Sequence, residues 1–327
     1  MPRVTVIIPN YNHARFLDQR LRSVLEQTLR DIEIILLDDA STDDSRQVIA
    51  RYEGHPSIRI VFNEHNSGSA CHQWNRGVAL ATAPYVWIAE ADDVAEPDLL
   101  ATLVAHLEAK PAAVLAYAQS WLIDENGQRT GDLNEWTTDL STDRWRQDFI
   151  NDGHDECARF LMVKNTIPNA SAVVFRRDAY LRADGAHEGM RLCGDWMTWA
   201  RLLLQGDVSF VARHLNHFRL HANSVRSTTG AFQYVAESLD VSRFISEQVP
   251  LTTADQRRAS CTVQTDWWGA LRYHPSPSIA TLLHSAKAAS HLGTWLPVKL
   301  LVLTPLARLA RSSWMQPMLR AKRKLTA

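Results

Sequence analysis

Tyr85-Val86-Trp87-Ile88-Ala89-Glu90-Ala91-Asp92-Asp93 is an apolar run of β type that ends in three carboxylates within four residues. Alternate residues of the run would face opposite sides of a sheet, and both sets are apolar, which predicts a buried central strand. Side chains at the carboxyl end of such a strand lie in the crevice where open α/β sheets bind ligands. We therefore expect a polar ligand at this end of the strand.

The three carboxylates Glu90, Asp92 and Asp93 would repel one another if nothing balanced their charge. A hard divalent cation such as Mg²⁺ or Mn²⁺ takes one or two carboxylates together with phosphate oxygens of a substrate, so the spacing predicts a metal–diphosphate site. The alternative is a solvated acidic turn, with Glu96 and Asp98 favouring the N-terminus of the next helix. The motif by itself leaves both interpretations open.

The first ninety residues alternate between strand and helix patterns. Pro9 would stop the first strand, Asn12 would cap the first helix, and Ser41-x-x-Asp44 is a capping-box variant that would open the second. This alternation predicts right-handed crossovers and a mostly parallel sheet. The predicted strands are 4–8, 32–37, 58–62 and 85–89, and the predicted helices are 13–29, one containing Val48, Ile49 and Tyr52, and one ending at Ala79.

The rest of the chain divides into a second α/β part and a helical part. A polar stretch at 132–165 has no clear period, so we expect an irregular excursion of the kind that forms binding loops. From about Ala231 the pattern is that of helices only. The predicted elements are a helix to Leu107, strands 113–120, 171–175 and 208–211, a turn at 125–127, a helix opened by Cys193-Gly194-Asp195-Trp196, and helices 231–247, 254–272, 276–292 and 295–312.

Composition and absent motifs exclude several classes of protein. The chain has 327 residues, a mass of 36.9 kDa and a formal net charge of -1, which does not favour a nucleic-acid binder. Its four cysteines lack Cys-x-x-Cys spacing, which predicts isolated thiols in a reducing compartment. We expect no signal peptide, and no apolar run is long enough to span a membrane. Glycine-rich dinucleotide loops, phosphate-binding Gly-Lys-Ser/Thr loops and Gly-x-Ser-x-Gly hydrolase elbows are also absent.

Several motifs together resemble the successive signatures of family 2 glycosyltransferases. This resemblance extends over about residues 3–225 and implies a GT-A fold, an α/β fold whose mostly parallel sheet lies between helices, and transfer of a sugar from a nucleotide-diphosphate donor with inversion. It divides the chain into a GT-A domain at 1–225, with a nucleotide-sugar half at 1–120 and an acceptor half at 121–225, and a helical C-terminal region at 226–327. The motifs are Val4-Thr5-Val6-Ile7-Ile8-Pro9-Asn10-Tyr11-Asn12, Leu37-Asp38-Asp39-Ala40-Ser41-Thr42-Asp43, Asn75-Arg76-Gly77, Glu90-Ala91-Asp92-Asp93 with Pro97, Gly194-Asp195-Trp196 and Arg219-Leu220-His221.

The resemblance also implies which residues bind the donor nucleotide. Asp39 would accept a hydrogen bond from the base, although it could instead cap a helix together with Ser41. Arg76 would meet the base or the diphosphate, although an arginine on a helix face is often only solvated. The implied donor-binding residues are Pro9, Tyr11, Asp39, Asn75, Arg76 and Ala91.

The metal and the catalytic base follow from the same resemblance. Asp92 corresponds to the metal-binding acid, Glu90 stands where most members carry Asp, and Asp93 and His221 are further candidate ligands for Mn²⁺ or Mg²⁺. The metal would neutralise the departing nucleoside diphosphate. Asp195 is the expected base, with an N-cap aspartate as the alternative, and Gly194 replaces a glutamate found in many members.

Two other functions and one further contact stay open. A nucleotidyltransferase shares this sheet architecture, and a non-catalytic nucleotide-sugar binding protein would explain Glu90 and Gly194. A leucine-rich segment followed by a basic C-terminus could lie on anionic lipid or simply pack in a core. Membrane contact would suit a cytoplasmic enzyme, peripheral on the inner face of the membrane, that acts on a glycan or lipid-linked acceptor in surface polysaccharide or glycolipid assembly.

Overall fold

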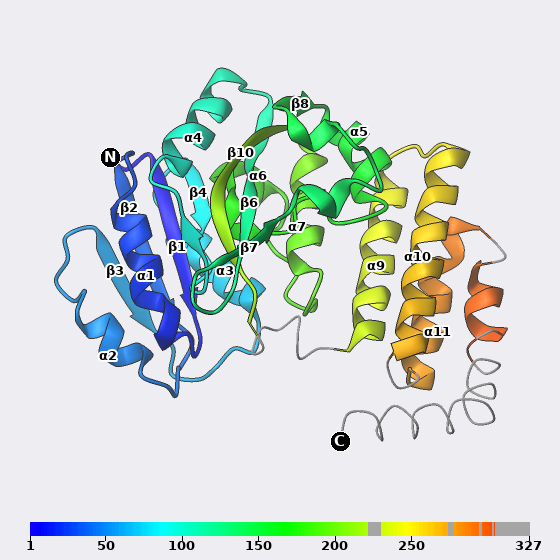
Figure 1. The fold of residues 1–327 in the computed structure, drawn as a ribbon, viewed down its shortest axis with the longest axis horizontal. Helices are drawn as coiled ribbons and strands as arrows, with labels where there is room; N and C mark the ends of the chain where they lie inside the picture. The colour runs from blue at the N-terminus through cyan, green and yellow to red at the C-terminus, as the bar shows by residue number, and fades with distance from the viewer. Residues whose placement is uncertain (222–229, 274–276, 294–295, 303, 305–327) are drawn as a thin grey trace. The chain divides into compact units, whose positions relative to one another are not determined.

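The computed structural model describes residues 1–221, 230–273, 277–293, 296–302 and 304 (Figure 1). The chain forms two compact units, one of Met1–Leu161 with Asn165–Thr228 and one of Met162–Lys164 with Thr229–Ala327. The predicted boundary at 225/226 falls within residues 222–229, outside the described part of the chain.

One mixed sheet organises the first unit. Its strand order is β3-β2-β1-β4-β9-β6-β10-β5, with β7 paired to β6 and β8 paired to β10. The predicted parallel arrangement of the first four strands is confirmed, since β1 pairs in parallel with both β2 and β4. The strands are β1 (Val4–Asn10), β2 (Ile32–Asp38), β3 (Ile58–Phe62), β4 (Tyr85–Ile88), β5 (Val94–Ala95), β6 (Ala113–Ile123), β7 (Arg129–Asp132), β8 (Phe149–Asn151), β9 (Val173–Arg176) and β10 (Asp207–Arg219).

Strand β4 is buried as predicted, with Trp87 fully enclosed. The first strand is longer than expected, because β1 continues through Pro9 to Asn10. Pairing of β1 with β4 stops at Ile7, and only β2 accompanies the last residues of β1. Pro9 therefore lies where the ladder with β4 has already ended, and its missing N–H does not interrupt that ladder.

Helices cover both faces of the parallel half of the sheet. On one face, α1 packs Leu17 and Leu21 into a core shared with Val6. On the other face, α3 approaches so closely that a Cβ at Gly77 would lie 2.4 Å from a methyl carbon of Ile7. The helices of this unit are α1 (Ala14–Leu25), α2 (Ser45–Ala50), α3 (Ala70–Leu80), α4 (Leu99–Ala109), α5 (Gly153–Glu156), α6 (Arg177–Arg182) and α7 (Gly194–Leu203).

Two predicted helix caps are wrong. Asn12 does not cap α1; its side-chain oxygen instead accepts hydrogen bonds from the backbone of Thr42 and Asp43, at 2.7 and 3.3 Å. Ser41 does not open α2, which begins only at Ser45, and its hydroxyl accepts from the backbone N–H of Asn12. The loops that follow β1 and β2 therefore bind each other, a long-range pairing that local capping patterns do not reveal.

The stretch 132–165 is less irregular than expected. It contains β8, α5 and the π-helix Cys157–Leu161, and the 3₁₀ turns Asn134–Thr137 and Arg144–Arg146. Its tryptophans hold it in place, because the Trp145 indole donates to the Tyr117 hydroxyl and the Trp136 indole to the carbonyl of Asn165. The polar composition of this stretch gave no indication of these two tryptophan hydrogen bonds.

The second unit is helical, as predicted. It contains α9 (Ala231–Gln248), α10 (Thr253–Tyr273), α11 (Ile279–Ala288) and the 3₁₀ turn Ala289–Leu292, and residues 296–302 are helical. Among the described residues, no helix has both the length and the apolar character needed to cross a bilayer. The basic residues from Arg308 onward lie outside the described residues.

Candidate active site at the carboxyl edge of the sheet

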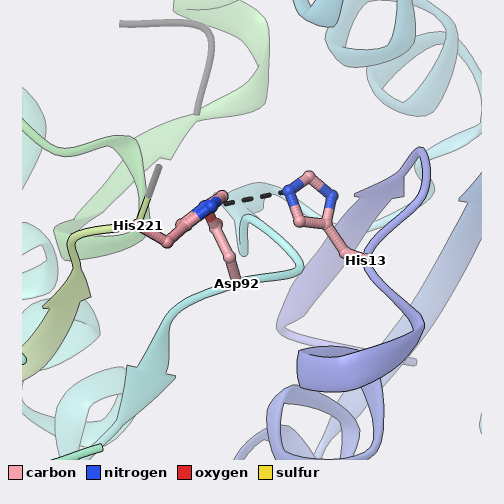
Figure 2. Close-up of side chains that lie close together, drawn as sticks. All are labelled: His13, Asp92 and His221. Carbon is pink, nitrogen blue, oxygen red and sulfur yellow. Dashed lines mark hydrogen bonds and ion pairs between the residues drawn. The ribbon is translucent and has the colours of Figure 1, made fainter. Parts of the chain in front are cut away.

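The loops after β1, β4 and β10 bring His13, Asp92 and His221 together (Figure 2). The Nε2 atom of His221 lies 2.9 Å from Oδ2 of Asp92, and Nε2 of His13 lies 3.9 Å from the same oxygen. One ligand atom from each residue lies within 4.8 Å of the others. Two imidazoles and a carboxylate form a donor set of the kind that binds divalent transition metals, so the residues fit a metal ion.

Arg219 holds the loop that carries Asp92. Its guanidinium donates to the backbone carbonyl of Asp92 at 2.6 Å and to the Gln19 side chain at 2.8 Å, and stacks over the Phe16 ring. The rings of His13 and His221 also approach Phe16, with centroid distances of 6.4 and 5.4 Å. The side chains of this cluster are therefore held by packing as well as by hydrogen bonds.

The Asp92–His221 pair favours opposite charges. Burial acts to raise the pKa of Asp92, but the hydrogen bond from His221 and the nearby charges of His13 and His221 outweigh it, so this pKa lies below its usual value. The same hydrogen bond raises the pKa of His221 despite burial. Asp92 is thus ready as an anionic ligand.

Glu90 has a different environment. Its Oε1 accepts the indole N–H of Trp74 at 2.8 Å, while its backbone is held by Ser171 and by Arg20. Burial, reinforced by the charge of Asp92, raises the pKa of Glu90 to about 8. Glu90 is therefore protonated at neutral pH and does not belong to the cluster that His13, Asp92 and His221 form among the described residues.

Asp93 is turned toward the protein interior. Its carboxylate accepts from the Asn169 amide at 3.0 Å and from the backbone N–H of Arg219 at 2.9 Å. Burial and the charge of Asp92 raise the pKa of Asp93 to about 6. The fully buried guanidinium of Arg20 lies 4.0 Å away, so Asp93 is the nearest anion to that buried cation.

Asp39 is buried at the end of β2 and orders the loop that leads to α3. Its carboxylate accepts from the Asn63 and Gln73 amides and from both the N–H and the hydroxyl of Ser67. It makes no capping bond to Ser41 among the hydrogen bonds of the described residues; the backbone of Ser41 donates to Asp38 instead. Asp39 therefore orders this loop, in addition to any contact that it makes with a ligand.

The other predicted donor-binding residues Asn75, Arg76 and Tyr11 differ in hydrogen bonding and exposure. Asn75 is engaged on both ends of its amide, since it accepts from the Tyr180 hydroxyl and donates to the carbonyl of Ala186. Arg76 is half-buried and makes no hydrogen bond or ion pair with the described residues. Tyr11 is 44% exposed.

Asp195 occupies the first turn of α7 and is partly exposed. Its Oδ2 accepts from the Asn165 amide at 3.1 Å, and its Oδ1 accepts from the N–H of Trp196 at 2.7 Å. The N-cap position of α7 is Cys193, not Asp195, so the capping alternative is wrong. Beside it, a Cβ at Gly194 would lie 2.4 Å from the Cys71 sulfur, so a larger side chain at this position would require the Cys71 side chain to move.

Sequence reasoning missed His13. A lone histidine carries no metal-ligand spacing, and its nearest partner in the cluster is 79 positions away, since 92 minus 13 is 79. A topological signal was nevertheless present, because adjacent parallel strands β1 and β4 end at the same edge of the sheet. Any polar residue just after β1 is therefore a neighbour of the acids after β4.

Comparisons with known proteins give a family match and similar sequences. The family model "Glycosyl transferase family 2" matches residues 5–180. Validoxylamine A glucosyltransferase of Streptomyces hygroscopicus subsp. jinggangensis is 36% identical over 118 residues, 35% of this chain and 28% of that protein. Glycosyltransferase GlyG of Streptococcus pneumoniae serotype 4 is 31% identical over 112 residues, 34% of this chain and 37% of that protein. The matched region thus spans about a third of the length of these relatives.

Solved structures share the fold at low sequence identity. S. aureus TarS 1–349 in complex with UDP-GlcNAc is 14% identical with a TM-score of 0.67, covering 95% of this chain and 88% of that one. The mannosyltransferase PcManGT from Pyrobaculum calidifontis, in complex with GDP-Man and Mn²⁺, is 16% identical with a TM-score of 0.59, covering 97% and 88%. These likenesses confirm the predicted GT-A-type sheet.

Proposed function

This chain belongs to glycosyl transferase family 2, and we therefore propose that it moves a sugar from a nucleoside-diphosphate donor to a hydroxyl acceptor with help from a divalent metal. The observation that carries the proposal is the Asp92–His221 pair at the carboxyl edge of β1 and β4, beside the Asp39 loop. Ligands of open α/β sheets bind at this edge.

Asp92 and His221 would hold the metal, Mn²⁺ or Mg²⁺, and the ion would neutralise charge on the departing nucleoside diphosphate. The Asp92 carboxylate is anionic, and Arg219 fixes its backbone. Glu90 and Asp93 lie behind this pair and would support it, Glu90 through its backbone contacts and Asp93 by balancing Arg20. Relatives in complex with UDP-GlcNAc or with GDP-Man and Mn²⁺ support a donor of this class.

The nucleotide would lie along the loops after β1 and β2. Asp39 would accept from the base while keeping the Ser67 loop ordered, and the partly exposed ring of Tyr11 would pack near it, together with Pro9 and Ala91. Arg76 has an uncommitted guanidinium, which suits a diphosphate. Asn75 would act by holding the loop of Ala186 and Glu188, since both ends of its amide are engaged there.

Asp195 would be the catalytic base. In an inverting transfer, the acceptor oxygen attacks the anomeric carbon as the bond from that carbon to the diphosphate oxygen breaks, and the acceptor's proton moves to the base. The Asn165 and Trp196 contacts orient the Asp195 carboxylate for this role, and its partial exposure leaves room for an acceptor. The short elements of 132–165, which carry Trp136, would help to select that acceptor.

The variant Asp195→Asn tests this assignment. We expect transfer to fall at least about 100-fold, the usual contribution of a general base, while the Kd for the nucleoside diphosphate stays within about twofold. Asp178→Asn, a change in an exposed ion pair, is the matched control. Turnover equal to that of the control would remove Asp195 from the mechanism, and turnover absent from the unmodified enzyme would favour a non-catalytic binding protein.

We further propose that the acceptor is a glycan or a lipid-linked glycan of surface polysaccharide assembly, reached from the cytoplasmic face of a membrane. Val298 and Val302 of the second unit are 45% and 51% exposed, and basic residues follow them in the sequence. Exposed apolar side chains followed by a basic stretch of sequence favour contact with anionic lipid. The protein should sediment together with vesicles that contain anionic phospholipid. Equal co-sedimentation with neutral vesicles would contradict an electrostatic contribution to membrane binding.

A further inference from the structure

His13 occupies a position that its backbone role does not explain. It is the N-cap residue of α1, yet its side chain makes no capping hydrogen bond. Ser, Thr, Asp and Asn are the usual residues at such positions because their oxygens accept from the helix backbone. In place of that contact, the imidazole of His13 is directed toward Asp92 and His221 (Figure 2).

The imidazole of His13 has no hydrogen-bond partner among the described residues. Its Nδ1 is buried and unpaired, and its Nε2 lies 3.9 Å from Asp92 Oδ2, beyond hydrogen-bond range. Buried polar atoms normally have a hydrogen-bond partner, so an imidazole with no hydrogen bond at either nitrogen requires an explanation. The ring is nevertheless held in place, because it packs edge-on against His221, with centroids 5.8 Å apart and an interplanar angle of 88°.

We propose that His13 is a third protein ligand of the divalent metal, an inference that rests on the proposed function of Asp92 and His221. Ligand atoms about 2.1 Å from an ion lie about 3.0 Å apart when adjacent and about 4.2 Å apart when opposite in an octahedron. The separations from Asp92 Oδ2, 2.9 Å to His221 and 3.9 Å to His13, are each within about 0.3 Å of one of these two values. All three ligand atoms lie within 4.8 Å of one another, so side-chain adjustments of a few tenths of an ångström would let one ion contact all three.

Two consequences follow for metal choice and for binding order. Mg²⁺ prefers oxygen ligands and commonly binds through one or two carboxylates plus substrate phosphates. Imidazole favours transition metals, so a site of two histidines and one aspartate selects Mn²⁺, Co²⁺ or Zn²⁺ over Mg²⁺. Three protein ligands also allow the ion to bind before the nucleotide arrives.

The test is Mn²⁺ binding without nucleotide, measured on the full chain by electron paramagnetic resonance of free Mn²⁺. We expect one bound ion, at least about tenfold weaker binding in His13→Gln, and a similar loss in His221→Gln. The exposed His154→Gln is the control, and matching far-ultraviolet circular dichroism establishes that each variant is folded. Pulsed resonance should detect two histidine nitrogens on the ion in the unmodified protein and one in either site variant.

The outcomes separate this inference from the proposed function. If His13→Gln binds Mn²⁺ as tightly as the unmodified protein, or leaves the nitrogen count unchanged, His13 is not a ligand. Asp92→Asn decides the underlying site in the same experiment, with UDP or GDP added. If that variant loses nucleotide-dependent Mn²⁺ binding while His13→Gln does not, only the inference about His13 fails. If Asp92→Asn also binds normally, the proposed metal site itself fails.

Discussion

The substitution Glu90→Gln should change how the stability of the first unit depends on pH. Burial raises the pKa of Glu90 from 4.5 to about 8. Between pH 5 and pH 7 the unfolded chain has mostly lost this proton while the native protein still holds it, so native stability falls as pH rises through that window. With about 1.4 kcal/mol per pKa unit, the difference integrates to about 2.5 kcal/mol, and to about 1 kcal/mol if solvent screens this partly exposed side chain.

Glutamine cannot ionise but can still accept the Trp74 indole N–H. The variant should therefore gain about 1 to 2.5 kcal/mol relative to the unmodified protein on going from pH 5 to pH 7. Urea unfolding is measured in the presence of chelator and monitored by hydrogen exchange of the β4 amides, which reports on the first unit. Glu188→Gln is the control, because the hydrogen bonds from Asn75 and His72 lower the pKa of that exposed acid and its titration lies below pH 5. A constant difference between Glu90→Gln and the unmodified protein over this range would refute a protonated Glu90.

Two further substitutions test the packing behind the site. Asp93→Asn should destabilise the first unit by about 1 to 3 kcal/mol in urea unfolding, because the buried Arg20 guanidinium loses its nearest anion while the burial penalty on the Asp93 charge is removed. The exposed-pair variant Asp178→Asn should lose less than about 1 kcal/mol, and equal losses would contradict the role given to Asp93. Gly194→Ala should destabilise by about 1 to 3 kcal/mol, since its Cβ would lie 2.4 Å from the Cys71 sulfur. Most of that loss should disappear in a Cys71→Ala background, and strictly additive effects in the double-mutant cycle would contradict the clash.

Much of the fold followed from sequence because the decisive signals were local. The apolar run of β4 and the alternation of strands with helices were sufficient to predict a parallel sheet, and the all-helical pattern after Ala231 predicted the second unit. The errors arose where distant residues decide local structure. Asn12 and Ser41 look like helix caps, yet each binds the other's loop.

Some residues of the candidate site could likewise be predicted from local sequence, and others could not. The motif around Asp92 and the late histidine His221 could be singled out from sequence, and they lie 2.9 Å apart. Sequence alone could not separate Glu90 and Asp93 from Asp92, because burial and partners on other strands decide which carboxylate is ionised and where it points. His13 was overlooked for the related reason that its neighbours come from other strands.

The measurement that tests the central claim most directly is calorimetric titration of the protein with UDP, GDP, dTDP, CDP and ADP, each with Mn²⁺ and with chelator. We expect selective binding of one diphosphate that weakens at least about tenfold in chelator and in Asp92→Asn. Binding that ignores both the metal and Asp92, or no binding of any diphosphate, would contradict a metal-assisted nucleotide-sugar transferase.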